Sequence, residues 1–590
     1  VMEFLSRYDL PVTLAMGLLR AYGDETLEKL KDNPYLLTDE RCGVDFSDAD
    51  EIALSMGFDG DSPCRVEAAV LYELNHNLSN GHVFLPRPKL IAATMELIGV
   101  TEETAEKALD DLTERHAVVC GPIANVQGCY LRRMYEAEVY VAGRLAAACA
   151  DTWDCGRNVD KIIDDIETRQ GIAYAPEQRR AVALAAERGV LLLTGGPGTG
   201  KTTSVRGIVT LFERMGLDTV LLAPTGRAAQ RMSQLCGKDA QTIHRALGMS
   251  WNELTGEVTF RKNEKEPLEA DAVIVDEMSM VDLDLMASLL RAMRPGCRLV
   301  MVGDPDQLPS VGAGNVLGDL LRSGVIPAVS LTVVFRQAQQ SAIIRNAHAV
   351  NHGQPPELKN NQNDFFFLCR RAPDRLVQTV VELCRDRLPA NMGIPADQIQ
   401  VLSPTRKGVC GTVNLNRALQ AALNPPAADK RQKPWGDMVF REGDRIMQTR
   451  NNYDVVWEKA DGTAGTGIFN GDVGVIREID PSGELITLQF DDRTCVYTAD
   501  LLNQLDMAYA MTVHKAQGSE YRAVVLASTA VAPALMVRGV LYTAITRARE
   551  LLILVGDDIV PGQMAANDKQ QRRYSGLRRR LREEAEHGLQ

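Results

Sequence analysis

Hydrophobic and polar residues follow two different patterns along this chain, and the change falls near Pro176. Upstream of it, apolar residues recur at helical spacing, as at Ala105, Ala108, Leu109 and Leu112, which would share one helix face. Turns rich in Gly, Pro, Asn and Asp separate these segments, so residues 1–150 are predicted to form short helices. Downstream, short β-type apolar runs alternate with amphipathic helices, which indicates parallel sheets covered on both faces.

The β-type runs fall into two series, and each series predicts one α/β domain. The first comprises residues 190–194, 219–223, 272–276 and 298–302. The second comprises residues 400–402, 524–527 and 551–555. The expected fold class is therefore α/β, with two such domains in tandem.

Two segments interrupt this alternation. Residues 251–267 carry the turn Leu254-Thr255-Gly256 between short polar–apolar alternations, which predicts a β-hairpin. Residues 441–505 contain many short β-type runs separated by Gly, Asp and Pro turns, a spacing typical of a small β-barrel. We expect this barrel to be an insertion in the second α/β domain.

The length and composition are those of a large globular protein. A chain of 590 residues is too long for one hydrophobic core, so roughly three to five packed units are expected. The apolar runs are too short to cross a bilayer and no export signal opens the chain, so we expect no membrane partner and a cytoplasmic location. Because the chain begins with Val1, we expect a longer natural N-terminus.

Cysteine content and net charge add no further function. The twelve cysteines are scattered, and the closest pairs, Cys120/Cys129 and Cys149/Cys155, lack clustered histidines, so reduced core residues are favoured over a zinc site. A net charge of −13 does not exclude a nucleic-acid partner, because binding depends on where the basic groups lie.

The strongest motif is GGPGTGKTT at residues 195–203, between an apolar strand and an amphipathic helix. Its glycines would let backbone N–H groups converge on phosphate oxygens beside a helix N-terminus. Lys201 would hold the β and γ phosphates of ATP, and the Thr202 hydroxyl would ligate Mg²⁺. The nucleotide-binding candidates of this loop are Gly196, Gly198, Thr199, Gly200, Lys201, Thr202 and Thr203.

Further motifs supply candidates for ATP hydrolysis. VIVDEMSM, at residues 273–280, would end a strand with Asp276 as a Mg²⁺ ligand and Glu277 as the group that activates water. Gln307 would sense the γ-phosphate, and Arg336 and Arg547 would complete the site from a second domain. Upstream of the first strand, the amide of Gln178 could read the adenine edge. Taken singly, each arginine could instead be an ordinary surface ion-pair residue.

The motifs also occur in a specific order. The phosphate loop, LLAPTGRAAQRM, TIHRAL, VIVDE, GDPDQLPSVG, FRQ, MTVHKAQGSE and YTAITRAR follow one another between residues 165 and 560. Together with SPTRKGVCGTVNLN, GDRIMQTRNNYD and IFNGDVG, they resemble the RecD-like group of superfamily 1 helicases. The resemblance implies two RecA-like domains, a strand-separating pin at the 251–267 hairpin and an SH3-like insertion at 441–505.

The resemblance also implies domain boundaries, which we state here as expectations. They are 1–65, a helix-hairpin-helix-like region; 66–160, a small helical domain; 161–330, the first RecA-like domain, with the pin at 250–268; 331–440 and 506–562, the second; 441–505, the insertion; and 563–590, a basic C-terminal tail. Because Glu583 and Glu584 follow the arginines of the tail, we interpret it as a solvated helix end rather than a DNA-binding element.

The resemblance further assigns residues to a single-stranded DNA path. Contacts of these residue types to phosphate are independent of base sequence, which suits a translocase. Taken singly, either histidine is more simply explained as an ordinary core residue. The candidates are Thr225, Gly226, Arg227, His244, Thr405, Arg406, Thr512 and His514.

The N-terminal residues distinguish members of the group. Residues 14–37 and 43–58 resemble the helix-hairpin-helix start of the stand-alone type, which disfavours the RecD subunit of a multi-subunit recombination exonuclease. One departure is Asp45, where the hairpin usually has a second glycine. A carboxylate there would repel phosphate, so a packed helical domain without DNA contact remains an alternative.

The expected function is that of an ATP- and Mg²⁺-dependent 5′–3′ helicase on single-stranded DNA, acting as a monomer in DNA repair or recombination. Its DNA partners would be single strands and forked or tailed duplexes, with single-strand-binding protein and other repair proteins as candidate protein partners. A relaxase–helicase fragment is disfavoured because no histidine cluster with a nearby tyrosine nucleophile occurs in the sequence. A DNA-binding module that does not hydrolyse ATP is disfavoured because Glu277, Arg336 and Arg547 are all present.

Overall fold

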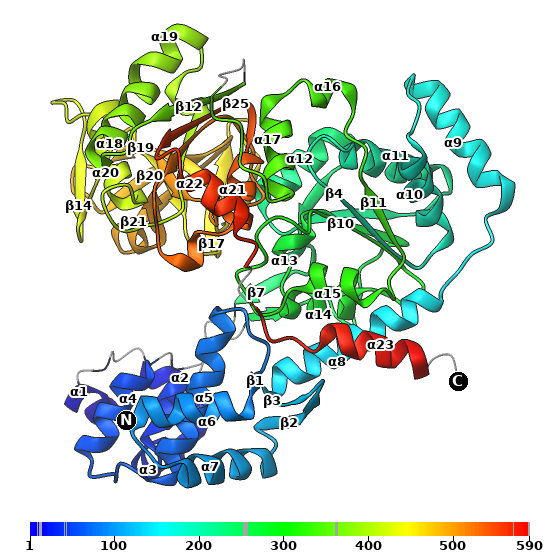
Figure 1. Ribbon diagram of the computed structural model, residues 1–590. Coiled ribbons are helices and arrows are strands. Elements are labelled where there is room, and N and C mark those ends of the chain that lie inside the picture. Colours follow the sequence, from blue (N-terminus) through cyan, green and yellow to red (C-terminus); the bar gives the residue numbers. More distant parts are fainter. Residues whose placement is uncertain are drawn as a thin grey trace.

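The computed structural model describes residues 1–8, 10, 14–39, 42, 44–251, 258–359, 364–569 and 572–587. Two α/β domains form its upper part, and a mainly helical N-terminal region lies below them (Figure 1). Within the described residues, no helix is long and apolar enough to cross a membrane.

The first α/β domain is built on a six-stranded parallel sheet with strand order β11-β4-β10-β9-β5-β6. Its central strands are buried along almost their whole length because helices cover both faces. The strands are β4 (Val190–Gly195), β5 (Thr219–Ala223), β6 (Ala240–Thr242), β9 (Ala272–Val275), β10 (Arg298–Gly303) and β11 (Ala328–Leu331). The main helices are α10 (Pro176–Glu187), α11 (Lys201–Arg214), α12 (Gly226–Cys236), α14 (Leu283–Ala292) and α15 (Val316–Ser323).

The second α/β domain has a five-stranded parallel sheet with order β12-β25-β24-β13-β23. The two sheets confirm the predicted pair of RecA-like domains. The strands are β12 (Phe365–Cys369), β13 (Ile399–Ser403), β23 (Ala510–Thr512), β24 (Tyr521–Ser528) and β25 (Ala548–Gly556). The main helices are α17 (Ala342–Asn351), α18 (Pro373–Glu382), α20 (Thr412–Leu423), α21 (Arg538–Ile545) and α22 (Val560–Ala566).

The predicted β-rich insertion lies between α20 and β23. It is a seven-stranded antiparallel sheet with order β18-β17-β21-β20-β19-β16-β22, and its buried core includes Ile446, Ile476, Leu488 and Phe490. The strands are β16 (Arg445–Gln448), β17 (Asn452–Lys459), β18 (Ala464–Ile468), β19 (Val473–Ile479), β20 (Leu485–Phe490), β21 (Arg493–Thr498) and β22 (Leu505–Met507). A two-stranded ladder, β14 (Gln432–Trp435) with β15 (Met438–Arg441), precedes it.

The segment expected to form the pin contains an antiparallel ladder. Strand β7 (Met249–Trp251) pairs with β8 (Val258–Phe260), with Met249 opposite Phe260. The predicted turn at Leu254-Thr255-Gly256 lies outside the described residues.

The N-terminal region is helical up to residue 114 and then contains a hairpin that the sequence analysis missed. Strands β2 (Val118–Ile123) and β3 (Val126–Leu131) pair antiparallel, and β1 (Leu85–Pro86) adds to β3. The two-residue turn places Ala124 in the left-handed region at φ 54°, where glycine or asparagine would have been the sequence signal. Residues 66–160 were expected to form a small helical domain, and the structure adds this hairpin to its helices.

The C-terminal helix α23 (Leu577–His587) is packed against the protein, contrary to its interpretation as a solvated helix end. It lies beside α8 (Arg132–Ala150), as Figure 1 shows in red and cyan. Leu577 and Leu581, four residues apart, are fully buried, and Arg580 pairs with the buried Glu138 of α8 at 2.8 Å. The prediction of a solvated helix end used only the charged residues of the tail. The apolar i, i+4 pair, which indicates a buried helix face, was not considered.

Candidate functional site

The phosphate loop connects β4 to α11 at the carboxyl end of the sheet. Gly198 and Gly200 have φ values of 75° and 83°, a backbone conformation that glycine adopts without strain. The Thr199 hydroxyl donates to the carbonyl of Gly196 at 2.8 Å, and the Lys201 ammonium donates to the carbonyls of Gly195 and Gly196. These bonds hold the loop in a compact turn at the start of a helix, as phosphate binding requires.

A cleft of about 490 Å³ opens beside this loop and is lined from both α/β domains. It brings together most of the residues that the sequence analysis selected for ATP chemistry. Its lining includes Gly196, Gly198, Gly200, Lys201, Thr202, Asp276, Glu277, Gln307 and Arg547. Thr199 belongs to the loop and Thr203 to the first turn of α11, and neither is part of the cleft lining.

Gln178 lies beneath the loop, in α10. Its amide is engaged at both ends, because Nε2 donates to the carbonyl of Gly200 at 3.1 Å and Oε1 accepts from the backbone N–H of Ala175 at 3.0 Å. The side chain is 2% exposed. In this conformation Gln178 supports the phosphate loop.

Asp276 and Glu277 follow β9 into the cleft. Glu277 has a φ of 55°, unusual for a residue with a side chain, and its N–H donates to Asp276 Oδ1 at 2.8 Å. Burial, and secondarily the neighbouring charge of Glu277, raises the pKa of Asp276 to about 6. A cation beside Asp276 would offset the cost of burying its charge and so favour the ionised carboxylate.

Gln307 belongs to a buried polar cluster that spans the two domains. Its Nε2 donates to Asp304 Oδ2 at 3.3 Å, and the same oxygen accepts from the hydroxyl of Tyr542 at 2.7 Å. Oε1 of Gln307 is buried and has no hydrogen-bond partner among the described residues, and the residue itself lines the cleft. Asp304 and Tyr542 belong to the motifs GDPDQLPSVG and YTAITRAR, but neither was among the residues predicted from the sequence.

Arg547 lies on the wall formed by the second domain, just before β25. It is 2% exposed, and its guanidinium donates to the carbonyls of Thr543 and Ser519 and to the hydroxyl of Thr546. All three acceptors are neutral, so these bonds leave its charge available for an anion. The other predicted arginine, Arg336, begins α16 (Arg336–Gln339), but its side chain lies outside the described part of the structure.

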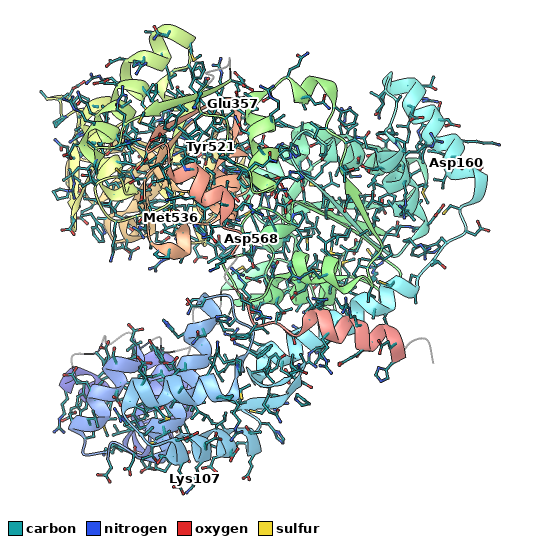
Figure 2. The ribbon with its side chains drawn as sticks, in the orientation of Figure 1. Lys107, Asp160, Glu357, Tyr521, Met536 and Asp568 are labelled. Atoms are coloured by element: carbon teal, nitrogen blue, oxygen red, sulfur yellow. The ribbon has the colours of Figure 1, made fainter. Side chains whose placement is uncertain are left out.

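The DNA-binding candidates form two groups. In the first domain, Thr225, Gly226 and His244 line a cleft of about 1730 Å³ that extends to the N-terminal region. Thr225 also caps α12 by accepting from the N–H of Ala228 at 3.3 Å. The guanidinium of Arg227 lies 5.6 Å from the ring centre of Tyr521, a second-domain residue labelled in Figure 2.

The second group lies at the carboxyl ends of neighbouring strands in the second domain. Ser403 of β13 is in register with Thr512 of β23, so Thr405 and His514 follow adjacent strand ends. Thr405 is half-buried and its hydroxyl donates to the carbonyl of Lys407 at 3.4 Å, and Arg406 is 3.7 Å from Asp506 in a partly exposed ion pair. Burial lowers the pKa of His514, with a further contribution from the Arg573 guanidinium, and burial also lowers the pKa of His244.

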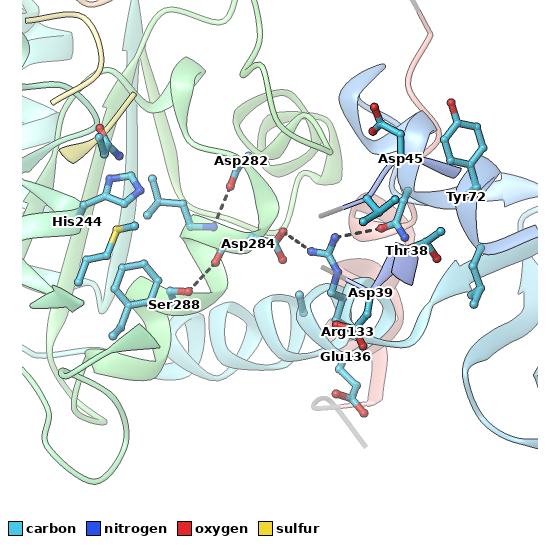
Figure 3. A pocket seen from close by; sticks show the side chains of 18 of the residues that line it. Thr38, Asp39, Asp45, Tyr72, Arg133, Glu136, His244, Asp282, Asp284 and Ser288 are labelled. Atoms are coloured by element: carbon cyan, nitrogen blue, oxygen red, sulfur yellow. Dashed lines mark hydrogen bonds and ion pairs between the residues drawn. The ribbon is translucent and has the colours of Figure 1, made fainter. Parts of the chain in front are cut away.

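The larger cleft also contains acidic residues that the sequence analysis did not select. Asp282 and Asp284 border it from the first domain, and Asp45 borders it from the N-terminal region (Figure 3). Arg133 bridges the two sides, 3.3 Å from Asp284 and 3.5 Å from the Asn75 side chain. Asp45, whose carboxylate was expected to repel DNA phosphates, therefore lines this cleft.

Comparisons with known protein families cover four segments of the chain. They match an ATP-dependent RecD2 DNA helicase HHH domain at residues 1–84, an AAA domain at 173–366, an ATP-dependent RecD-like DNA helicase SH3 domain at 415–490 and a UvrD-like helicase C-terminal domain at 507–555.

Two curated relatives and one solved structure illustrate these similarities. The ATP-dependent RecD2 DNA helicase of Deinococcus radiodurans is 33% identical over 583 residues, covering 97% of this chain and 76% of that protein. The RecBCD enzyme subunit RecD of Mycobacterium tuberculosis is 32% identical over 442 residues, covering 69% of this chain and 73% of that protein. A Pif1 helicase from Bacteroides in complex with ADP-AlF3 and single-stranded DNA aligns with a TM-score of 0.40 at 19% identity, covering 67% of this chain and 94% of that one.

Proposed function

The chain belongs to the ATP-dependent RecD2 DNA helicase family, and on that premise we propose that it moves 5′ to 3′ along single-stranded DNA and unwinds the duplex ahead. The family membership confirms the predicted resemblance and the expectation of an ATP-dependent DNA helicase. The observation that carries the proposal is the cleft that holds Lys201 on one wall and Arg547 on the other. A nucleotide bound between them would draw the two domains together.

Within this cleft, we assign Lys201 to the β and γ phosphates and Glu277 to activation of the attacking water. Gln307 would accept a hydrogen bond from that water through its unpartnered Oε1. Arg547, joined by Arg336, would stabilise the charge that develops on the transferred phosphoryl group. Gln178 remains our candidate for contact with adenine, a role that requires its amide to release Gly200.

The residues present fit a Mg²⁺ ion bound together with ATP. Asp276 and Thr202 line the same cleft, beside the phosphate loop. We therefore propose that Asp276, Thr202 and the nucleotide oxygens hold the ion. When bound, Mg²⁺ neutralises phosphate charge.

Movement would follow from alternating grips on the strand by the two groups of candidate residues. Thr225, Gly226, Arg227 and His244 lie on the first domain, whereas Thr405, Arg406, Thr512 and His514 lie on the second. Closure of the cleft on ATP would bring the groups together, and its opening after hydrolysis would separate them. The β7–β8 ladder is our candidate for the pin that meets the fork. A role in DNA repair or recombination is part of the same proposal.

The test is unwinding of two duplexes that differ only in the polarity of their single-stranded tail, with ATP and Mg²⁺. We expect unwinding with the 5′ tail and little with the 3′ tail, and Glu277→Gln serves as the hydrolysis-deficient control. Preference for the 3′ tail would refute the direction. Rapid unwinding of blunt ends would instead favour a role like that of the RecD subunit in a recombination exonuclease.

A further inference from the structure

A single arginine of the C-terminal segment inserts into the loop that follows the γ-phosphate sensor. Nη1 of Arg573 donates to the carbonyls of Gly314 at 2.7 Å and Gly312 at 3.1 Å, and to the hydroxyl of Ser310 at 3.4 Å. Nη2 donates to the carbonyl of Ser310 at 2.7 Å. One planar guanidinium therefore fixes both ends and the middle of the loop 310–314.

This loop continues directly from the ATP site. Three residues before Ser310 lies Gln307, and the intervening Leu308 is held by the second domain. Its N–H donates to the hydroxyl of Thr543 at 2.9 Å, and its carbonyl accepts from the Gln517 amide at 2.7 Å. The loop is thus attached to the second domain at Leu308 and to Arg573 a few residues later.

The same junction reaches the N-terminal region. The N–H of Gly314 donates to the carbonyl of Gly81 at 2.9 Å, and the N–H of Val83 donates to the carbonyl of Tyr574 at 2.8 Å. Gly81 has a φ of 84°, and a Cβ there would collide with the guanidinium of Arg573. The loop 310–314 is therefore hydrogen-bonded both to the N-terminal region, at Gly81, and to the C-terminal segment, at Arg573.

Arginine chemistry suits this position. Four acceptor atoms converge on one side chain, and the rigid fork of donors in a guanidinium reaches all of them. Nη1 has two hydrogens for three acceptors, so its longest contact, to the Ser310 hydroxyl at 3.4 Å, shares a hydrogen with a carbonyl. A lysine ammonium is a point charge on a flexible stem and would fix fewer of them. The neighbouring Arg572 is exposed and provides a matched reference, because it carries the same charge one residue away.

We propose that Arg573 is a positioning residue for ATP hydrolysis, which holds the loop 310–314 so that Gln307 is correctly placed and links turnover to the position of the N-terminal region. This inference rests on the proposed function, in which Gln307 takes part in ATP hydrolysis. Arg573 itself touches neither nucleotide nor DNA in this assignment. Its effect should therefore appear in turnover rather than in substrate affinity.

The experiment compares the full chain with its Arg573→Ala, Arg573→Lys and Arg572→Ala variants. It measures kcat and KM for ATP with saturating single-stranded DNA, the Kd for that DNA, and Tm. We expect Arg573→Ala to lower kcat about tenfold, an effect typical of substitutions at residues that couple two sites. KM and Kd should change less than about twofold. Arg573→Lys should recover part of the loss, and Arg572→Ala should match the unmodified chain.

A second variant approaches the junction from the opposite side and guards against misfolding of the first. Gly81→Ala should displace the guanidinium and lower kcat similarly, and the double variant with Arg573→Ala should lose no more kcat than the single one, because both changes break the same contact. The backbone strain of alanine at this positive φ is independent of Arg573, so it should add to the loss of Tm but not to the loss of kcat. Unchanged kcat in Arg573→Ala, or losses that simply add, would overturn the inference. If the unmodified chain failed to hydrolyse ATP in the presence of single-stranded DNA, the proposed function would fail and this inference with it.

Discussion

Glu138 and Arg580 form a buried ion pair although 442 residues separate them in the chain. The carboxylate of Glu138 is completely buried, and Arg580 Nε approaches it at 2.8 Å. The hydroxyl of Tyr130 and the N–H of Gly576 donate to the same carboxylate, so its oxygens are well satisfied. This pair joins α23 to α8 and so links the C-terminal segment to the N-terminal region.

Removing one member of this pair should destabilise the protein strongly. Arg580→Met would leave the Glu138 carboxylate buried without its counter-charge, which typically costs about 3–5 kcal/mol. We expect a clearly lower urea midpoint for the unfolding step that releases α23. Limited proteolysis at increasing urea concentrations measures this step. Arg579→Met is the matched control, because Arg579 pairs with Glu583 at the surface, where such pairs contribute only about 0–1 kcal/mol.

A double change separates charge burial from loss of packing. Glu138→Met combined with Arg580→Met removes both charges and should regain much of the lost stability, because no unpaired ion remains buried. If the double variant were as unstable as Arg580→Met alone, lost packing rather than the unpaired carboxylate would explain the effect.

Lys201→Ala should abolish nearly all ATP hydrolysis while leaving binding to single-stranded DNA largely intact. The reason is spatial, because Lys201 lines the smaller cleft and the candidate strand-binding residues Thr225 and His244 line the larger one. Hydrolysis assays and fluorescence anisotropy with a labelled oligonucleotide measure the two properties separately. Retention of DNA-stimulated hydrolysis in this variant would contradict the assignment of the phosphate loop.

Arg547→Ala should bind nucleotide but hydrolyse it poorly. An arginine that stabilises the transition-state charge in phosphoryl transfer contributes about 10³–10⁵ in rate. Single-turnover hydrolysis and titration with a fluorescent nucleotide measure the two effects. Because the guanidinium also donates to backbone carbonyls of Thr543 and Ser519, equal losses in binding and turnover would indicate a structural role instead.

The two candidate strand-binding histidines predict a specific pH dependence. Burial lowers the pKa of His244 and of His514, so each ring becomes protonated only below the ordinary range near about 6.5. Both rings are then neutral at neutral and alkaline pH, and the affinity for single-stranded DNA should stay constant there. At acid pH, below the ordinary histidine range, protonation adds positive charge beside phosphate and should tighten binding.

The control for this pH dependence is the double variant His244→Gln with His514→Gln. It should bind DNA with no comparable tightening at acid pH, as measured by anisotropy at fixed ionic strength. A wild-type affinity that fell across the alkaline range, and only in the presence of these rings, would show that they are charged at neutral pH.

Features encoded by short motifs were predicted well from the sequence. The phosphate loop and the Asp276-Glu277 strand end depend on neighbouring residues, and the structure brings both into one cleft as expected. The two parallel sheets likewise follow from local alternation of strands and helices. The roles of these residues in hydrolysis remain predictions.

Features that depend on distant partners were not predicted. The contact of Tyr542 with Asp304 spans 238 residues, and that of Arg573 with Gly314 spans 259. A tyrosine or arginine in a loop has no local pattern that names its partner, because the partner is set by how whole domains pack. The hairpin at 118–131 was missed for a different reason, since Ala124 occupies a turn position where glycine would have been informative.

The packing of α23 against α8 and α15 also bears on how the protein is made. During synthesis, residues 132–150 leave the ribosome long before residues 577–587. Glu138 therefore lacks its ion-pair partner Arg580 while both α/β domains are being synthesised. Domains generally fold in order as they emerge, and exposed apolar surface at that stage favours aggregation. The surface of α8 around Glu138 therefore reaches its final packing only after α23 has been translated.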